Sequence, residues 1–247
     1  MFSDVRRRSV LLSALTGAAF AALGVTVTST PARTLAGGGP PDLPVSNVNT
    51  PAGSLSALRS GVTYQASRFP LALRVTPSDG TWSGAQWRTT TRGKPAFGWA
   101  ELGQGPATAP PRGIVQLETA YGPTPSVAAT IAHLQRGGSH LPASHVGGTT
   151  FHAATPVKLA GYSGRQFDGT VWGVYGHTFV PFSATTRGAS PADSYHLEKG
   201  ESFRLVALNV NGKTVVLLYD NIALPIEQFP AFIASANRLL RSLTFHA

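Results

Sequence analysis

Alternating apolar and polar residues mark the start of the folded part of the chain. In residues 69–75, Leu71, Leu73 and Val75 take every second position. A period of two places one side of a strand on a core, so this segment predicts a β-strand. Other β-forming runs predict further strands at 82–90, 97–102, 113–120, 156–160, 164–171 and 243–245.

The strongest local signal is a hairpin centred on Asn211-Gly212. These two residues separate a β-forming run at 203–210 from another at 213–220. Asn-Gly is the preferred two-residue hairpin turn, because both residues must adopt positive φ. The two runs therefore predict a long antiparallel hairpin.

Two segments carry apolar residues at helical spacing. The first follows Thr124, the predicted N-cap, and ends at Gly137. The second covers about 227–241, because Pro230 is tolerated only in a first turn. Since each helix has one apolar stripe to bury, the chain predicts an α+β fold, a mainly antiparallel sheet covered by helices.

The first 36 residues have the layout of an export signal. Arg7 and Arg8 precede an almost uncharged, mildly hydrophobic stretch at 9–31. The paired arginines, followed by one residue and two apolar ones, resemble the twin-arginine export signal, and small residues predict cleavage after Ala36. An ordinary secretory signal is one alternative. An uncleaved anchor is another, because residues 10–27 approach the ~20 residues that cross a bilayer.

The rest of the chain predicts a flexible Pro/Gly/Ser-rich linker at 37–62 and a single α+β domain at 63–247. A domain of this length buries roughly 70% of its unfolded surface without disulfide or metal support. The chain has no cysteine, which excludes a disulfide framework and the acylated cysteine of a lipoprotein.

The net charge is +9, and removing residues 1–36 leaves +6, because four of 20 basic and one of 11 acidic residues are lost. This charge could favour peripheral contact with an anionic surface, but arginine-rich codon usage is the preferred explanation. The arginines are scattered, so nucleic-acid binding is not predicted.

A recognisable pattern runs through the C-terminal part of the chain. It comprises Gln166-Phe167-Asp168, the hairpin tip at Gly212 and the apolar ending at 229–245. This pattern resembles the Mog1/PsbP-like α/β/α sandwich group, and within it uncharacterised exported actinobacterial, lipoprotein-like proteins. The resemblance implies a fold whose members mostly bind or assemble other proteins and share no catalytic apparatus. No catalytic residues are carried over.

Patterns that suggest metal or catalytic chemistry are weak. Four histidines within twenty residues have spacings that match no compact ligand motif, so no metal or cofactor is predicted. Gly161 to Arg165 superficially suggests a nucleophile elbow, but Arg165 occupies a position that requires glycine, so a hairpin turn is predicted instead. The four histidines considered above as metal ligands are His133, His140, His145 and His152.

A glycosidase-type carboxylate pair is a further possibility, since such enzymes need two acidic residues. Nothing in the spacing selects two of the available carboxylates. The candidates are Asp168, Asp193, Glu198, Glu201 and Asp220.

An insertion at 172–202 is the predicted binding region. It is long for a structureless connection, and such loops are more often functional than filler. Aromatic and histidine side chains on a loop can line a ligand or partner groove. An alternative role, predicted for Phe179 and Phe182, is to pin the loop to the sheet as core. The candidate binding residues are Trp172, Tyr175, His177, Tyr195 and His196.

Together these features favour an exported, non-enzymatic binding or assembly module of the bacterial cell envelope. Its partner would be an envelope protein or a small ligand. The alternatives are a carrier of a small apolar ligand and a hydrolase with an unrecognised site.

Overall fold

The computed structural model describes seven stretches of the chain: residues 39–45, 55–91, 93–105, 111–137, 148–174, 176–182 and 195–246. They belong to one compact unit, Gly38–Ala247. The predicted export signal, with Arg7 and Arg8, lies outside the described residues, so the domain boundaries stay predictions. Within these stretches, no helix is long and apolar enough to cross a membrane.

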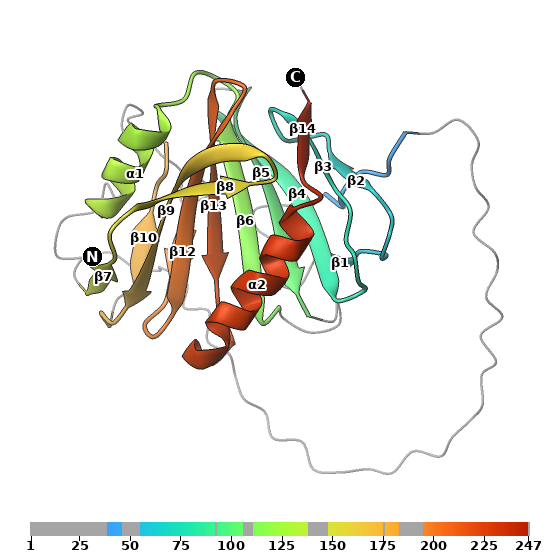
Figure 1. Cartoon of the computed structure of the whole chain (residues 1–247). Helices are drawn as coiled ribbons and strands as arrows, with labels where there is room; N and C mark the ends of the chain where they lie inside the picture. The colour runs from blue at the N-terminus through green and yellow to red at the C-terminus, as the bar shows by residue number, and fades with distance from the viewer. Residues whose placement is uncertain are drawn as a thin grey trace, which may run out of the picture. The chain divides into compact units, whose positions relative to one another are not determined.

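A large antiparallel sheet forms the centre of the fold (Figure 1). β8 (Thr155–Leu159) pairs with β9 (Tyr162–Val171) at one edge, beside β7 (Thr149–Phe151). The described strands follow the order β1 (Ser56–Ala57), β4 (Trp82–Thr91), β5 (Lys94–Gln104), β6 (Gly113–Ala120), β13 (Lys213–Asp220), β12 (Ser202–Val210), β9 and β7.

Smaller elements pack on both faces of this sheet. One face meets α2 (Phe229–Leu240), which follows the 3-10 helix η4 (Ile226–Gln228), and a small sheet of β14 (Thr244–His246), β3 (Ala72–Val75) and β2 (Tyr64–Ala66). The other face meets α1 (Val127–Gln135) and the paired strands β10 (His177–Phe179) and β11 (Tyr195–Leu197).

The central hairpin shows why both faces need a cover. On β12, Val206 and Leu208 belong to the core under α2, whereas Leu205 and Ala207 belong to the core under α1. All four side chains are buried. A strand that is buried on both sides reads as a continuous apolar run. This explains the strong β signal of the segment.

The helices cover less of the sheet than the sequence predicted. α2 has 12 residues and α1 has nine, so they are about 18 and 14 Å long. Strands lie about 4.8 Å apart, and a helix is about 10 Å wide, so two such helices cannot cover nine strands. The fold is mainly antiparallel sheet with two short α-helices among the described elements, and short strands supply the remaining cover.

Two local predictions can be compared with the backbone. The hairpin is confirmed: Asn211 and Gly212 have φ of 52° and 83°, and strands β12 and β13 pair up to the turn. The N-cap prediction was wrong. Ser126 caps α1, and its hydroxyl accepts from the Ala129 N–H at 3.2 Å. Thr124 instead accepts from the Thr214 N–H at 2.8 Å, which fastens the approach to α1 onto β13.

The turn between β8 and β9 also differs slightly from the prediction. It is formed by Ala160 and Gly161, with φ of 50° and 86°, rather than by residues 161–164. Ser163 lies inside β9, opposite Lys158. The hairpin interpretation is therefore confirmed, and Ser163 does not sit on a strand-to-helix elbow.

Candidate functional site

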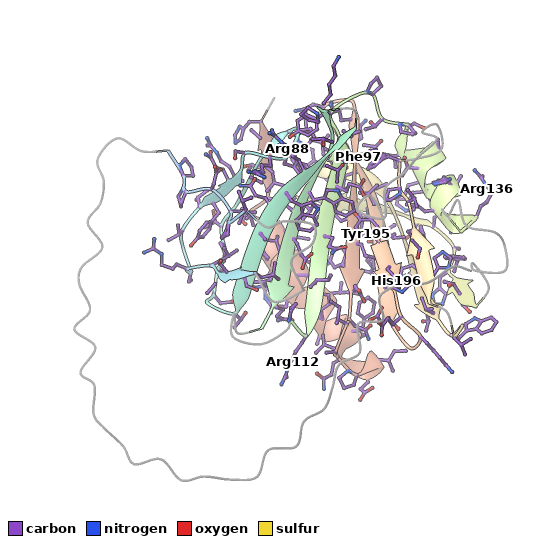
Figure 2. The ribbon with its side chains drawn as sticks, turned by 180° about the vertical axis from the view of Figure 1, so that it is seen from behind. Arg88, Phe97, Arg112, Arg136, Tyr195 and His196 are labelled. Atoms are coloured by element: carbon purple, nitrogen blue, oxygen red, sulfur yellow. The ribbon has the colours of Figure 1, made fainter. Side chains whose placement is uncertain are left out.

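The strand pair β10–β11 places the predicted binding residues on two opposite sides. His177 and Tyr195 point into the core and are each 1% exposed. His196 points outward and bonds Thr178, with 2.9 Å between Nδ1 and Oγ1. Both Tyr195 and His196 are labelled in Figure 2. Tyr175 lies outside the described residues.

His177 connects three elements from inside the core. Its Nε2 lies 2.9 Å from the Gly137 carbonyl oxygen, and its Nδ1 lies 2.8 Å from the Thr149 hydroxyl. A carbonyl only accepts, so Nε2 donates to Gly137, and in a neutral imidazole Nδ1 then accepts from the Thr149 hydroxyl. Burial lowers the pKa of His177, and the nearby His196 acts in the same direction. His177 thus ties β10 to β7 and to the end of α1.

Phe179 and Phe182 fit the alternative role predicted for them. Phe179 is fully buried, and its ring lies 4.2 Å from the His177 ring and 5.2 Å from that of Phe203 on β12. Phe182 stacks on Phe97 of β5 at 6.1 Å. Both side chains belong to the core under α1, so they pin the insertion to the sheet.

Tyr195 packs into an aromatic group on the same face. Its ring meets Trp99 edge-on at 5.0 Å, and Trp99 stacks on Trp87 at 5.7 Å. Burial raises the pKa of the Tyr195 hydroxyl well above its usual value, and the adjacent Glu118 carboxylate raises it further. Tyr195 therefore stays protonated and does not reach the surface.

Trp172, like His196, is a candidate residue that is open to a partner. It follows β9, and its side chain is 62% exposed, while that of Val174 is 71% exposed. The N–H groups of Trp172 and Gly173 both donate to the Gly148 carbonyl, at 2.6 and 2.9 Å. The Gly200 N–H donates to Val171 on the other side, at 2.7 Å. We call residues 172–174 the β9 tip.

Gly148 is required for this arrangement. Its φ is +104°, and a Cβ atom there would lie 2.3 Å from the Gly173 Cα. Only glycine tolerates both the backbone angle and the close approach. The β9 tip is thus held by backbone contacts and presents its apolar side chains in one fixed place.

A row of polar side chains lies on the sheet face that α1 covers, and of its residues only Asp220 was named as a candidate from the sequence. Glu118 of β6 is fully buried, and Asp220 of β13 is 3% exposed. The Gln116 amide donates to Glu101 at 2.8 Å across β5 and β6. These residues occupy the positions that alternate with apolar ones on their strands. The sequence shows acidic residues inside apolar runs, which was the available signal.

The buried acids have perturbed proton affinities. Burial, followed by the charge of Glu201, raises the pKa of Asp220 well above its usual value. Burial also raises the pKa of Glu201 to about 7, against a hydrogen bond from the Glu198 backbone N–H. Groups of this kind are frequent at functional sites, although buried structural acids behave in the same way.

The other residues considered for chemistry are dispersed. Asp168 forms an ion pair with Arg204, and Asp193 lies beyond the described ranges. His133 on α1 donates to the Val180 carbonyl at 2.9 Å. His140 and His145 are also outside the described residues. Across the part of the chain that the structure describes, no group of three His, Cys, Asp or Glu residues could hold a metal ion.

Comparisons with known proteins leave the family open. No family model matches the chain, and no curated protein matches its sequence. One similar solved structure is the protein of unknown function PA94 from Pseudomonas aeruginosa, with 9% identity and a TM-score of 0.33 over 74% of this chain and 96% of that one. Another is LpqN of Mycobacterium tuberculosis, involved in cell envelope biogenesis, with 15% identity and a TM-score of 0.30 over 83% of each chain. Likeness at this level supports no conclusion about this chain's fold or function.

Proposed function

We propose that this protein is an exported, non-enzymatic binding or assembly module of the bacterial cell envelope. The observation that carries the proposal is the β9 tip, where Trp172 and Val174 are exposed on a turn held by backbone hydrogen bonds. A large apolar side chain usually avoids water, and tryptophan is enriched among the residues that dominate protein interfaces. Because the turn is already ordered, this chain loses little conformational freedom when a partner binds it.

The edge of the sheet adds a second contact surface beside the tip. β7 ends the order of the described strands, and Thr149 pairs with Val171, directly before Trp172. On its outer side, β7 has no strand partner among the described elements. An edge of this kind can accept an extended segment of another chain through backbone hydrogen bonds. The proposed interface therefore combines the β9 tip with the edge strand next to it.

The N-terminal pattern supports the proposed location. Arg7 and Arg8, the mildly hydrophobic stretch and the cleavage position after Ala36 favour export by the twin-arginine route. We also infer that the fold is a variant of the Mog1/PsbP-like α/β/α sandwich, since α1 and α2 lie on opposite faces of one antiparallel sheet. Members of that group mostly bind or assemble other proteins.

Two cavities on the described surface do not favour an apolar-ligand carrier. Their linings are rich in polar side chains, among them Asp168 and Arg204 in one and Arg165 and Asn209 in the other.

Site-specific photo-crosslinking in living cells tests the proposal. A photoreactive phenylalanine analogue replaces Trp172 in one variant and Ile226 in a matched control, because Ile226 is 55% exposed at the start of η4. We expect a discrete protein adduct from position 172 and none from position 226. Adding unlabelled wild-type protein should suppress the adduct, whereas Trp172→Ser protein should not.

Two results contradict the proposal. One is the absence of an adduct at position 172 in cells where the protein is folded and exported. The other is an identical set of adducts from both positions, which indicates random collision with neighbouring proteins.

A further inference from the structure

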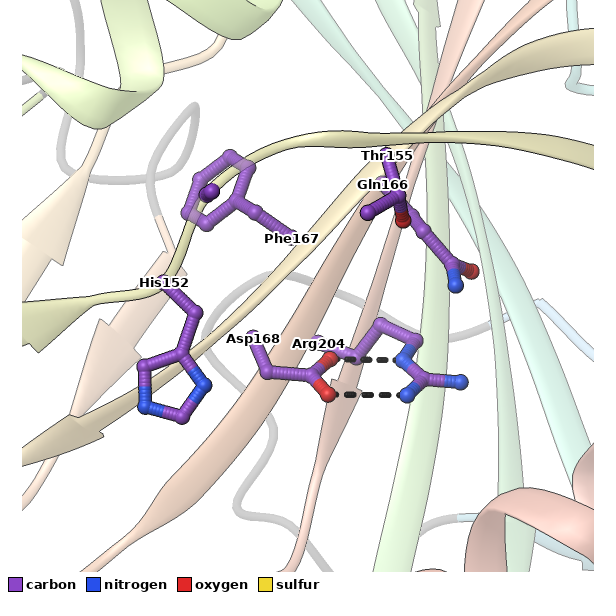
Figure 3. A pocket seen from close by; sticks show the side chains of 7 residues that line it. His152, Thr155, Gln166, Phe167, Asp168 and Arg204 are labelled. Atoms are coloured by element: carbon purple, nitrogen blue, oxygen red, sulfur yellow. Dashed lines mark hydrogen bonds and ion pairs between the residues drawn. The ribbon is translucent and has the colours of Figure 1, made fainter.

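A polar cavity of about 280 Å³ lies between β8, β9 and β12 (Figure 3). Arg204 has the same strand parity as Val206, so the cavity opens on the α2 side of the sheet. We propose that this cavity binds one unit of a neutral, polyhydroxylated ligand, namely a sugar residue of a glycan. The lining includes the side chains of His152, Thr155, Gln166, Asp168 and Arg204.

The cavity arises from an irregularity in the sheet edge. β7 pairs Phe151 with Gly169, and β8 pairs Thr155 with Gln166. Residues 152–154 of the outer chain therefore lie opposite only two residues of β9. One extra residue on one strand forms a bulge that bends the strand locally. The bulge borders the cavity, because His152, Ala153 and Thr155 are among the lining residues.

An ion pair fixes the centre of the cavity. The Arg204 guanidinium donates to both Asp168 carboxylate oxygens, from Nε at 2.6 Å and from Nη2 at 2.8 Å. The two side chains are 20% and 37% exposed, so a ligand can reach both. Asp168 raises the pKa of Arg204, which keeps the guanidinium charged. Figure 3 shows the third guanidinium nitrogen directed away from Asp168.

The charge balance of this pair selects the ligand class. An anionic ligand that approaches Arg204 meets the negative charge of Asp168, and a cationic ligand that approaches Asp168 meets the guanidinium. A neutral ligand meets neither repulsion. Asp168 retains free acceptor lone pairs, Arg204 retains donors, and the Gln166 amide offers both. Hydroxyl groups both donate and accept, so a polyol can satisfy this mixture of groups.

The size of the cavity agrees with one sugar ring. At about 30 Å³ per water molecule in the liquid, 280 Å³ corresponds to roughly nine waters. The cavity volume of about 280 Å³ lies just below the range of roughly 300–1,000 Å³ for small-molecule sites. A peptide anchored by an apolar side chain fits less well, because Ala153 and Phe167 are the apolar residues of the lining.

The cavity and the β9 tip share no lining residue. Trp172 is not among the residues that line the cavity, so each site can be altered without replacing a residue of the other. Failure of the photo-crosslinking experiment would thus leave the sugar site untouched, and the reverse also holds.

NMR titration of the isotope-labelled full chain tests the inference. The probes are soluble, unmodified tetrasaccharides of glucose, mannose and N-acetylglucosamine, with inorganic phosphate and a neutral tetrapeptide as competitors. We expect at least one tetrasaccharide to shift the backbone amides of Gln166, Asp168 and Arg204. Asp168→Asn and Gln166→Ala should each weaken its binding about tenfold, since each removes a hydrogen-bonding group. Arg238→Gln, an exposed position on α2, should bind as wild type.

Gln166→Ala keeps the test valid if the ion-pair variant does not fold. The Gln166 side chain makes no hydrogen bond to any described residue, so its truncation changes the cavity and leaves the Asp168–Arg204 pair in place. The inference is overturned if no tetrasaccharide shifts these amides, if phosphate or the peptide shifts them instead, or if Gln166→Ala binds the sugar as tightly as wild type.

Discussion

The substitution His177→Phe removes two buried hydrogen bonds and keeps an aromatic ring in the core. The imidazole is 1% exposed and bonds the Gly137 carbonyl at 2.9 Å and the Thr149 hydroxyl at 2.8 Å. A buried polar group that loses its partner costs about 1–3 kcal/mol. The carbonyl bears most of this cost, and the half-buried hydroxyl adds about 1 kcal/mol. We therefore expect the free energy of unfolding to fall by about 2–4 kcal/mol.

The same residue has a defined effect on pH dependence. Burial lowers the pKa of His177 below 6.5 in the folded state, whereas the unfolded chain has the ordinary value. The unfolded state then binds more protons than the folded state at pH below 6.5. The contribution of His177 to the free energy of unfolding is fully present above pH 6.5, and it is lost as the pH falls toward the folded-state pKa of His177. The cost of His177→Phe should therefore be largest above pH 7 and shrink toward pH 5.

Urea unfolding of both proteins at several pH values measures this difference. Comparing the two free energies at each pH cancels the contributions of other titrating groups, such as Glu201. Thr149→Val provides a second variant that removes one of the two hydrogen bonds and leaves the imidazole in place. A difference between wild type and His177→Phe that stays constant from pH 5 to pH 8 would refute the assignment of a buried neutral imidazole.

Three further predictions concern other parts of the chain. Glu201→Gln should raise the free energy of unfolding by about 1 kcal/mol near pH 8 and leave it unchanged at pH 4.5. Burial favours the protonated Glu201 carboxyl, so the stability of the wild-type protein decreases as the pH rises through the folded-state pKa of about 7. Urea unfolding at the two pH values checks this. Gly148→Ala should lower the free energy of unfolding by about 1–3 kcal/mol, because φ at this position is +104° and the added Cβ would lie 2.3 Å from the Gly173 Cα. A thermal unfolding temperature equal to that of wild type would contradict this prediction. Replacing Arg7 and Arg8 by lysine together should retain the protein in the cytoplasm, as cell fractionation would show, whereas undiminished export would favour the ordinary secretory route.

The regular elements were predictable because their signals are local. The turn at Asn211-Gly212 needs two positive φ angles that few other residue pairs provide, so the hairpin register follows from the sequence. Pro230 likewise placed the start of α2, which is preceded by a 3-10 turn. In each case the deciding residues lie within a few positions of the feature they determine.

The N-cap of α1 needed longer-range information. Thr124 and Ser126 are equally suitable caps by residue type. Thr214, ninety positions away, bonds the Thr124 hydroxyl and leaves Ser126 to cap the helix. The spacing of residues along the sequence does not indicate which of the two residues caps the helix.

The candidate site was predictable only in part, for the same reason. Trp172 and His177 stand five positions apart in one aromatic insertion, yet one is exposed and the other is buried. The difference arises because β10 pairs with β11 and turns His177 toward the sheet. The bulge at 152–154 and the cavity beside it also depend on how two chain segments align. No single segment reveals such an alignment.

Strand β9 joins the two proposed binding regions within one continuous backbone. Gln166 and Asp168 line the cavity near its middle, and Trp172 directly follows its last residue. Any change in affinity that a sugar in the cavity causes at the tip must be matched by an equal change that a partner at the tip causes in the cavity. If a glycan in the cavity strengthens binding at the tip, a partner at the tip therefore strengthens retention of the glycan by the same factor. The strand would then make attachment to the envelope and recruitment of a partner mutually reinforcing events.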